Sequence, residues 1–181
     1  MSRVPLTYRE TDRETGQRVA DVFDEVRAQL GFIPSVFRAY ANNPTLLTEL
    51  WGRYQHTMLT GNLPRRLKEE IALMVASDEH SDYGITLHSS ALKQLGVESH
   101  EILRFRTDPD HTHLGPREHA LLEIARHGNM SPHDHGERYI DHARETGVAD
   151  ADILEALAVA SLAAEISHVS TMLDIPVDIR P

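Results

Sequence analysis

The sequence contains no cysteine among its 181 residues. Disulfide bonds, thiolate catalysis and cysteine-ligated zinc are therefore excluded. Glycine and proline are not enriched, with 10 and 9 residues, so the composition is neither that of a collagen-like chain nor that of a wholly disordered one. A chain of this length can bury a substantial core, and we predict a single domain spanning residues 1–181.

Positive charge is also scarce. The chain has 18 Lys and Arg against 28 Asp and Glu, for a net charge of −10. Nucleic acids and anionic membranes are bound by clustered Lys and Arg, so we expect neither partner. The first residues lack the apolar core of a signal peptide, and no run approaches the ~18 apolar residues of a membrane span. We therefore expect a cytoplasmic protein. The negative net charge does not exclude a small acidic substrate, because the local charge of the site decides its binding.

Helical periodicity is what the sequence does show. No segment alternates apolar and polar residues as a half-buried strand would, so we predict an all-α fold. The last helix carries apolar or small residues on more than one face and must be buried nearly all round. It is therefore either central to the core or shared with a partner chain, and we expect a homo-oligomer. The expected helices span about 19–30, 36–42, 44–58, 64–76, 82–95, 98–106, 116 onward, 132–146 and 152–173.

The chain is organised around residues 63–97, which read as two helices joined by a polar elbow. Pro64 suits the start of the first helix, and Gly96 suits a left-handed cap after the second. Residues 77–82 interrupt the apolar stripe with small, charged and imidazole side chains. We predict a helix junction there, with Ser81 or Asp82 capping the second helix.

This stretch resembles the carboxymuconolactone decarboxylase and alkylhydroperoxidase-D-like family. That family carries a Glu, a Cys-x-x-Cys pair beginning twelve residues later, and a His after three further residues. Glu69 and His88 match the Glu and the His, while Ser81 and Gly84 occupy the cysteine positions. The resemblance implies an alkylhydroperoxidase-D-like helical domain that assembles as a homo-oligomer. Its parts would be a helical extension (1–62), the motif helices (63–97) and a second helical half (98–181).

Glu69, His88 and Ser81 are the candidate catalytic residues. Glu69 could act as a general base or proton shuttle, or simply favour the helix dipole near an N-terminus. His88 could relay protons, or be a core histidine bonded to a carboxylate or carbonyl. Ser81 could be a nucleophile if His80 or His88 served as its base, but N-capping is the more natural role.

Three further residues are candidate substrate contacts. His80 precedes the Ser81 position, and Tyr83 stands where the family often has an aromatic residue. Gly84 has no side chain and could leave room for a pocket.

Twelve histidines raise the question of a metal site. His56, His80 and His88 with Glu69 could form a His/carboxylate site with an open position. However, no His-x-x-x-His or His-Glu-x-x-His pair falls on one helix. Four other histidines are expected in loops or at a helix start. The four are His111, His113, His133 and His135. We therefore predict neither a metal nor a cofactor.

The function predicted from these residues is cofactor-free acid/base chemistry on a small organic acid, as in the decarboxylase branch of the family. Arg53, Arg65 and Arg66 are the cations nearest in sequence for its carboxylate. Dithiol-dependent peroxidase activity is not expected, because both thiols are missing. The alternatives are a catalytically inactive binding or structural oligomer and a metal-dependent His/Glu site. An enzyme should show Glu69 and His88 converging on an open cavity, whereas a structural protein should show them bonded and sealed.

A faint repeat with an offset of 51 residues relates the two halves. Leu63-Pro64-Arg65 resembles the segment 114–117, and Gly96-Val97 recurs as Gly147-Val148. This pattern fits either a duplicated helical unit or a chance coincidence of helix-start and helix-stop signals. Under the offset, the second copy lacks the Glu–His pair.

Overall fold

The computed structural model describes residues 2–9, 12–108 and 114–177. These residues form helices and no strand, which confirms the all-α prediction. His111 and His113 lie outside the described residues. The elements are α1 (Arg13–Leu30), α2 (Ser35–Tyr40), α3 (Pro44–Tyr54), the π-helical turn η1 (Gln55–Leu59), α4 (Arg65–Asp78), α5 (Asp82–Gln94), α6 (Ser99–Thr107), α7 (Pro116–Met130), α8 (Gly136–Glu145) and α9 (Asp150–Met172).

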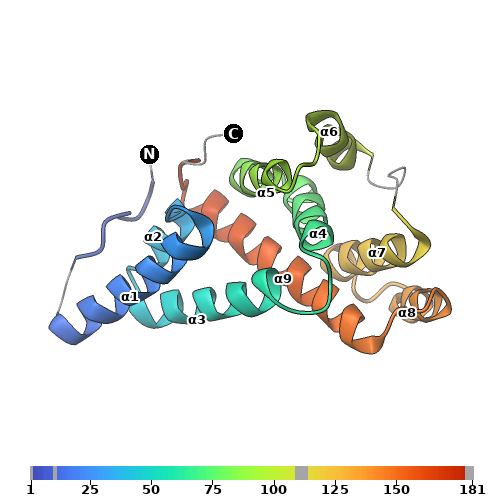
Figure 1. Cartoon of the computed structure of the whole chain (residues 1–181), viewed down its shortest axis with the longest axis horizontal. Coiled ribbons are helices and arrows are strands. Elements are labelled where there is room, and N and C mark those ends of the chain that lie inside the picture. The colour runs from blue at the N-terminus through green and yellow to red at the C-terminus, as the bar shows by residue number, and fades with distance from the viewer. Residues whose placement is uncertain (1, 10–11, 109–113, 178–181) are drawn as a thin grey trace.

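Helix α9 crosses the centre of the molecule, and helices from both halves of the chain pack against it (Figure 1). Helices α4, α5 and α7 pack against it, α1 and α3 form a pair at one end, and α7 and α8 form a pair at the other. By length and composition alone, α9 could span a membrane, because its most apolar 18-residue window has a mean hydropathy of 1.4. This departs from the expectation that no segment would qualify. More than half of that window is buried inside the fold, as in the core helix of a soluble protein.

Helices α4 and α5 form the predicted hairpin. Helix α4 ends at Asp78 and α5 begins at Asp82, so the helix junction lies where the sequence placed it. Ser81 is the N-cap of α5, and its Oγ accepts a hydrogen bond from Gly84 N at 3.2 Å. His80 has a φ of 55° and turns the chain between the two helices.

The second half repeats three helix boundaries of the first. Helices α4 and α7 begin at 65 and 116, α5 and α8 end at 94 and 145, and α6 and α9 begin at 99 and 150, each pair offset by 51. The turn after α5 bonds Val97 N to Leu92 O, and the turn after α8 bonds Val148 N to Ala143 O, both at 3.0 Å. These shared boundaries and turns favour a duplicated unit over coincidence.

Two predicted helix starts were wrong. Helix α1 begins at Arg13 rather than near residue 19, because the Asp12 side chain caps it by accepting from Thr15 N.

The other is the start of α8. We expected Ser131 to cap a helix with Pro132 in its first position. Instead Ser131 is the C-cap of α7, and α8 begins five residues later at Gly136, after His135 with a φ of 58°. Ser131 N donates to His127 O at 2.8 Å, so local chain continuation from α7 prevailed over the capping signal.

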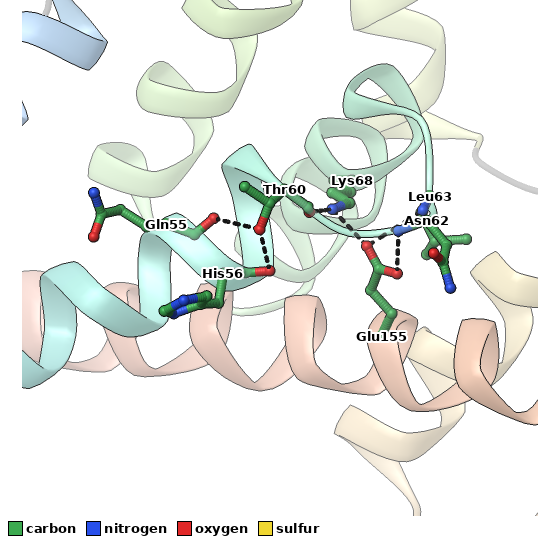
Figure 2. A network of polar contacts seen from close by, with 7 residues as sticks. All are labelled: Gln55, His56, Thr60, Asn62, Leu63, Lys68 and Glu155. Atoms are coloured by element: carbon green, nitrogen blue, oxygen red, sulfur yellow. Dashed lines mark hydrogen bonds and ion pairs between the residues drawn. The ribbon is translucent and has the colours of Figure 1, made fainter.

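A buried ion pair fixes the chain where it enters α4 (Figure 2). Lys68 Nζ lies 2.5 Å from Glu155 Oε1 and also donates to the carbonyl of Thr60. The Glu155 carboxylate accepts in addition from Asn62 N at 2.8 Å and Leu63 N at 3.3 Å. Helix α9 therefore holds the segment 60–63, which is separated from Arg65 only by the N-cap Pro64.

The N-terminal helices are joined to the rest by aromatic residues. Phe37, Trp51 and Tyr54 pack together, with Trp51 stacked on Tyr54 at a ring separation of 5.9 Å. Trp51 Nε1 donates to Glu25 Oε2 at 2.7 Å, which ties α1 to α3. The cluster thus joins α1, α2 and α3, and Tyr54 bonds Arg65 at the start of α4.

Candidate functional site

Glu69 and His88 meet in the interior of the α4–α5 hairpin. His88 Nδ1 lies 2.7 Å from Glu69 Oε2, and the two side chains are about 1–2% exposed. The predicted contact between neighbouring helices is therefore confirmed, but the prediction that both side chains face an open cavity was wrong, because the pair is sealed in the interior. His88 Nε2 is buried and has no hydrogen-bond partner among the described residues.

Glu69 is held as a carboxylate despite its burial. Burial alone would raise its pKa, but the hydrogen bond and charge of His88, together with Arg65, outweigh burial and lower the pKa below its ordinary value. Because the carboxylate can only accept, His88 Nδ1 carries the hydrogen and donates it. Removing either partner would leave a buried polar group unpaired.

Arg65 connects this buried pair to the surface. Its guanidinium contacts Glu69 Oε1 from two nitrogens, at 2.6 and 2.7 Å, and it also bonds Tyr54. The Arg65 side chain is 31% exposed, whereas Glu69 behind it is sealed. Burial and the charge of Glu69 raise the pKa of Tyr54, so its phenol keeps its proton across the physiological range.

A cavity of about 230 Å³ opens in front of Arg65 and Tyr54. It lies between the end of α1, the start of α4 and the C-terminal half of α5. Apolar side chains make most of its wall, and two amides and a hydroxyl stand among them. Glu69 and His88 do not line it. The lining residues are Gln29, Leu30, Phe32, Tyr54, Arg65, Leu87, Ser90, Ala91, Gln94 and Leu95.

Ser81 and His80, two other candidates, have structural roles in the elbow. Ser81 is fully buried and caps α5, as predicted. His80 is exposed, and its Nδ1 contacts Asp78 O at 2.9 Å. Neither lines the cavity in front of Arg65.

Tyr83 and Gly84 are both buried and serve packing. Tyr83 Oη accepts from Val36 N at 3.1 Å and so ties α5 to α2. A methyl group at Gly84 would lie 2.8 Å from Ala76 Cβ and 3.0 Å from Ser167 Oγ. The space that we expected at Gly84 is therefore filled by α4 and α9, and it forms no pocket.

Of the three candidate cations, only Arg65 faces the cavity. Arg66 pairs with Glu70 at 2.8 Å, and Arg53 pairs with Glu165 at 2.7 Å. Within the described ranges, no group of three or more His, Asp or Glu side chains could hold a metal ion. His56 is exposed and contacts Gly52 O, so the set proposed for a metal is not assembled there.

Comparison with known proteins identifies similar sequences and folds. Residues 45–127 match the model of the carboxymuconolactone decarboxylase family. An alkyl hydroperoxide reductase of Mycobacterium tuberculosis, Rv2159c, is 31% identical over 84 residues, which are 46% of this chain and 24% of that protein. The chain thus matches about a quarter of the relative's length. Over residues 45–127 the chain is therefore similar to the carboxymuconolactone decarboxylase family, but it lacks cysteine.

Solved structures show the same fold over nearly the whole chain. An uncharacterized peroxidase-related protein from Silicibacter sp. TM1040 has a TM-score of 0.84 at 22% identity, covering 97% of this chain and 91% of that one. A peroxidase-related protein with an alkylhydroperoxidase AhpD core, from Ralstonia eutropha JMP134, has a TM-score of 0.82 at 18% identity, covering 96% and 93%. The debrominase Bmp8, in complex with 2,3,4-tribromopyrrole, has a TM-score of 0.77 at 18% identity, covering 98% and 94%.

Sequence reasoning missed the cavity and most of its wall. The spacing of Arg65 and Glu69, four residues apart on one helix, is a signal for an ion pair that could have linked Arg65 to the site. Tyr54 lies at the end of α3 and Phe32 in the turn after α1, and nothing in their local sequence indicates that they line the cavity. Their place in the site follows from packing alone.

Proposed function

We propose that this protein binds a small organic acid in the cavity in front of Arg65 and decarboxylates or protonates it without a cofactor. The observation that carries this proposal is the position of Arg65, whose guanidinium faces the cavity while Glu69 and His88 hold it from behind. Arginine is suited to carboxylate recognition, because its guanidinium carries five N–H donors, more than its bonds to Glu69 and Tyr54 use. The apolar wall would strengthen that contact by excluding water.

Tyr54 is the group that we assign to proton transfer. Its hydroxyl keeps its proton and stands at the cavity beside Arg65. When a bound 3-oxo acid loses carbon dioxide, the electron pair of the broken C–C bond remains as an enolate. Arg65 would stabilise this negative charge, Tyr54 would protonate the carbon, and solvent would restore the Tyr54 proton. Glu69 and His88 would act through Arg65 rather than on the substrate.

The test uses benzoylacetate, a single-ring 3-oxo acid, whose decarboxylation consumes one proton and yields acetophenone and carbon dioxide. We expect the EDTA-treated protein to accelerate this reaction above its spontaneous rate. Tyr54→Phe should lower kcat with little change in KM, and Arg65→Gln should raise KM. Arg66→Gln is the matched control, because Arg66 forms the same i,i+4 pair one residue along α4 but does not line the cavity.

The second candidate is a non-catalytic binding protein that kept the fold. The sealed contact between Glu69 and His88 favours it, because this is the arrangement that we expected of a member without chemistry. Binding of the acid without any acceleration of its decarboxylation would support this candidate. Absence of both binding and acceleration would refute the proposed site.

We further propose that the protein is a homo-oligomer. Helix α9 exposes Leu154 at 68% and Met172 at 71%, although most of its other large apolar side chains are buried. A second copy covering this face would remove that apolar surface from water. Light scattering should give a multiple of 20.4 kDa, and Leu154→Glu should reduce it towards that value. A wild-type mass of one chain at micromolar concentration would refute the assembly.

A further inference from the structure

The wall of the cavity opposite α5 comes from outside the family-matched segment. Gln29 and Leu30 end α1, and Phe32 follows in the turn, all upstream of residue 45 where the match begins. The matched segment supplies the cation and the α5 wall. The upstream helix therefore closes a cavity whose charged end belongs to the family domain.

Phe32 is held firmly in place. Gly31 ends α1 with a φ of 81°, a left-handed conformation that reverses the chain directly before Phe32. Ile33 and Pro34, which follow, are buried. The bond between Trp51 and Glu25, together with the buried valines of α1, fixes that helix on α3. The half-buried ring of Phe32 is thus presented to the cavity by a constrained turn.

Size limits what this cavity can take. Its volume of about 230 Å³ is below the roughly 300–1,000 Å³ typical of pockets for drug-sized ligands. One ring with a carboxylate is the scale that fits. A neighbour of the same fold, Bmp8, is described in complex with a single-ring compound, 2,3,4-tribromopyrrole.

We propose that Phe32 selects planar aromatic acids over flexible aliphatic acids of similar size, so that the N-terminal extension sets the specificity of the site. This inference rests on the proposed function, because it takes Arg65 as the carboxylate anchor. The ring of a bound acid would lie between Phe32 and the α5 wall formed by Leu87 and Ala91. Contact between two aromatic rings contributes binding free energy beyond that of apolar burial, whereas an aliphatic chain against Phe32 gains only the burial.

Trp51 provides the readout. It is the only tryptophan of the chain, and it stacks on Tyr54, which lines the cavity. Benzoate and hexanoate are titrated while the Trp51 fluorescence is recorded, for the wild type, Phe32→Leu and Phe23→Leu. Phe23→Leu is the matched control, since Phe23 lies on α1, just before the Phe32 turn, and packs on the core but does not line the cavity. Thermal unfolding of each variant checks that it is folded.

We expect the wild type to bind benzoate more tightly than hexanoate. Phe32→Leu should weaken benzoate binding about two- to tenfold and leave hexanoate binding unchanged, and Phe23→Leu should change neither. If Phe32→Leu changes both affinities equally, or neither, the selector role is refuted while the acid site stands. If the wild type binds neither acid, the proposed site fails and the selector role with it.

Discussion

Two adjacent ion pairs on α4 have the same spacing in the sequence, but the pKa values of their carboxylates are shifted in opposite directions. Arg65 pairs with Glu69 and Arg66 pairs with Glu70, each four residues apart, and both carboxylates are buried. Yet the pKa of Glu69 is lowered and the pKa of Glu70 is raised. Each carboxylate has an arginine partner, so the presence of an arginine alone does not explain the difference.

The surroundings of each pair make the difference. Burial opposes both charges, but Glu69 gains a second buried partner in His88. Glu70 has only Arg66, whose side chain is 54% exposed, and the carboxylates of Glu118 and Glu101 lie nearby. An identical local pattern therefore gives a stabilised carboxylate in one place and a disfavoured one in the other, according to what the neighbouring helices bring.

The largest expected effect separates the two carboxylates by stability. Glu69→Gln should cost about 3–5 kcal/mol in the free energy of unfolding at pH 7, because it leaves charged or polar partners buried without their anion. Glu70→Gln should cost less than about 1 kcal/mol, because it removes a carboxylate that burial and like charges already disfavour. Urea unfolding of both variants measures this. Similar losses in the two variants would show that the pairs are energetically alike.

The pH dependence should have opposite signs for the two residues. Glu69 has a folded pKa below its ordinary value of 4.5, so its stabilisation is present above that pH and is lost as the pH falls through the folded pKa. Glu70 has a raised pKa, so its contribution is present at low pH and is lost as the pH rises through the folded value.

Unfolding free energies measured between about pH 3 and pH 7 for the wild type and the two Gln variants test this. The advantage of the wild type over Glu69→Gln should shrink with acid, by about 1.4 kcal/mol for each unit of pKa difference. Relative to Glu70→Gln, the wild type should instead gain. The same sign in both comparisons would contradict the assigned shifts.

A smaller effect is expected from forcing the two helices of the hairpin apart. In Gly84→Ala the added methyl group would meet Ala76 Cβ at 2.8 Å, and overpacking of this kind costs about 1–3 kcal/mol. It should loosen the contact of His88 with Glu69 and leave the Arg66–Glu70 pair unaffected. Gly52→Ala is the control, since a methyl group there meets nothing within 4 Å and should be neutral or stabilising. Urea unfolding that ranks the two variants equally would argue against tight packing at Gly84.

The smallest expected effect concerns the cap that starts the helix carrying His88. Ser81→Ala removes the bond to Gly84 N and should cost about 1 kcal/mol in thermal or urea unfolding. Thr86→Ala on the same helix removes a hydroxyl that bonds only within its own turn, and it should cost less. A loss at Ser81 no larger than that at Thr86 would mean that the cap does not secure the position of His88.

The sequence alone determined the helical fold, the hairpin, the elbow at 77–82 and the contact between Glu69 and His88. These follow from local signals, because apolar spacing, caps and helix-stopping glycines act over a few residues, and because the family spacing places the Glu and the His at matching levels of two antiparallel helices. The helix start predicted at Pro132 was wrong, because Ser131 N bonds to His127 O and the residue closes α7 instead of capping a new helix.

Only the tertiary structure decided that the site is a sealed pair with Arg65 as its exposed end. The burial of Glu69, the filling of the space at Gly84 by Ala76 and Ser167, and the cavity between Phe32 and α5 all arise where helices distant in sequence meet. The opposite pKa shifts of Glu69 and Glu70 arise in the same way. Desolvation and neighbouring charge depend on what surrounds a group in space, and a residue's sequence neighbours do not specify that.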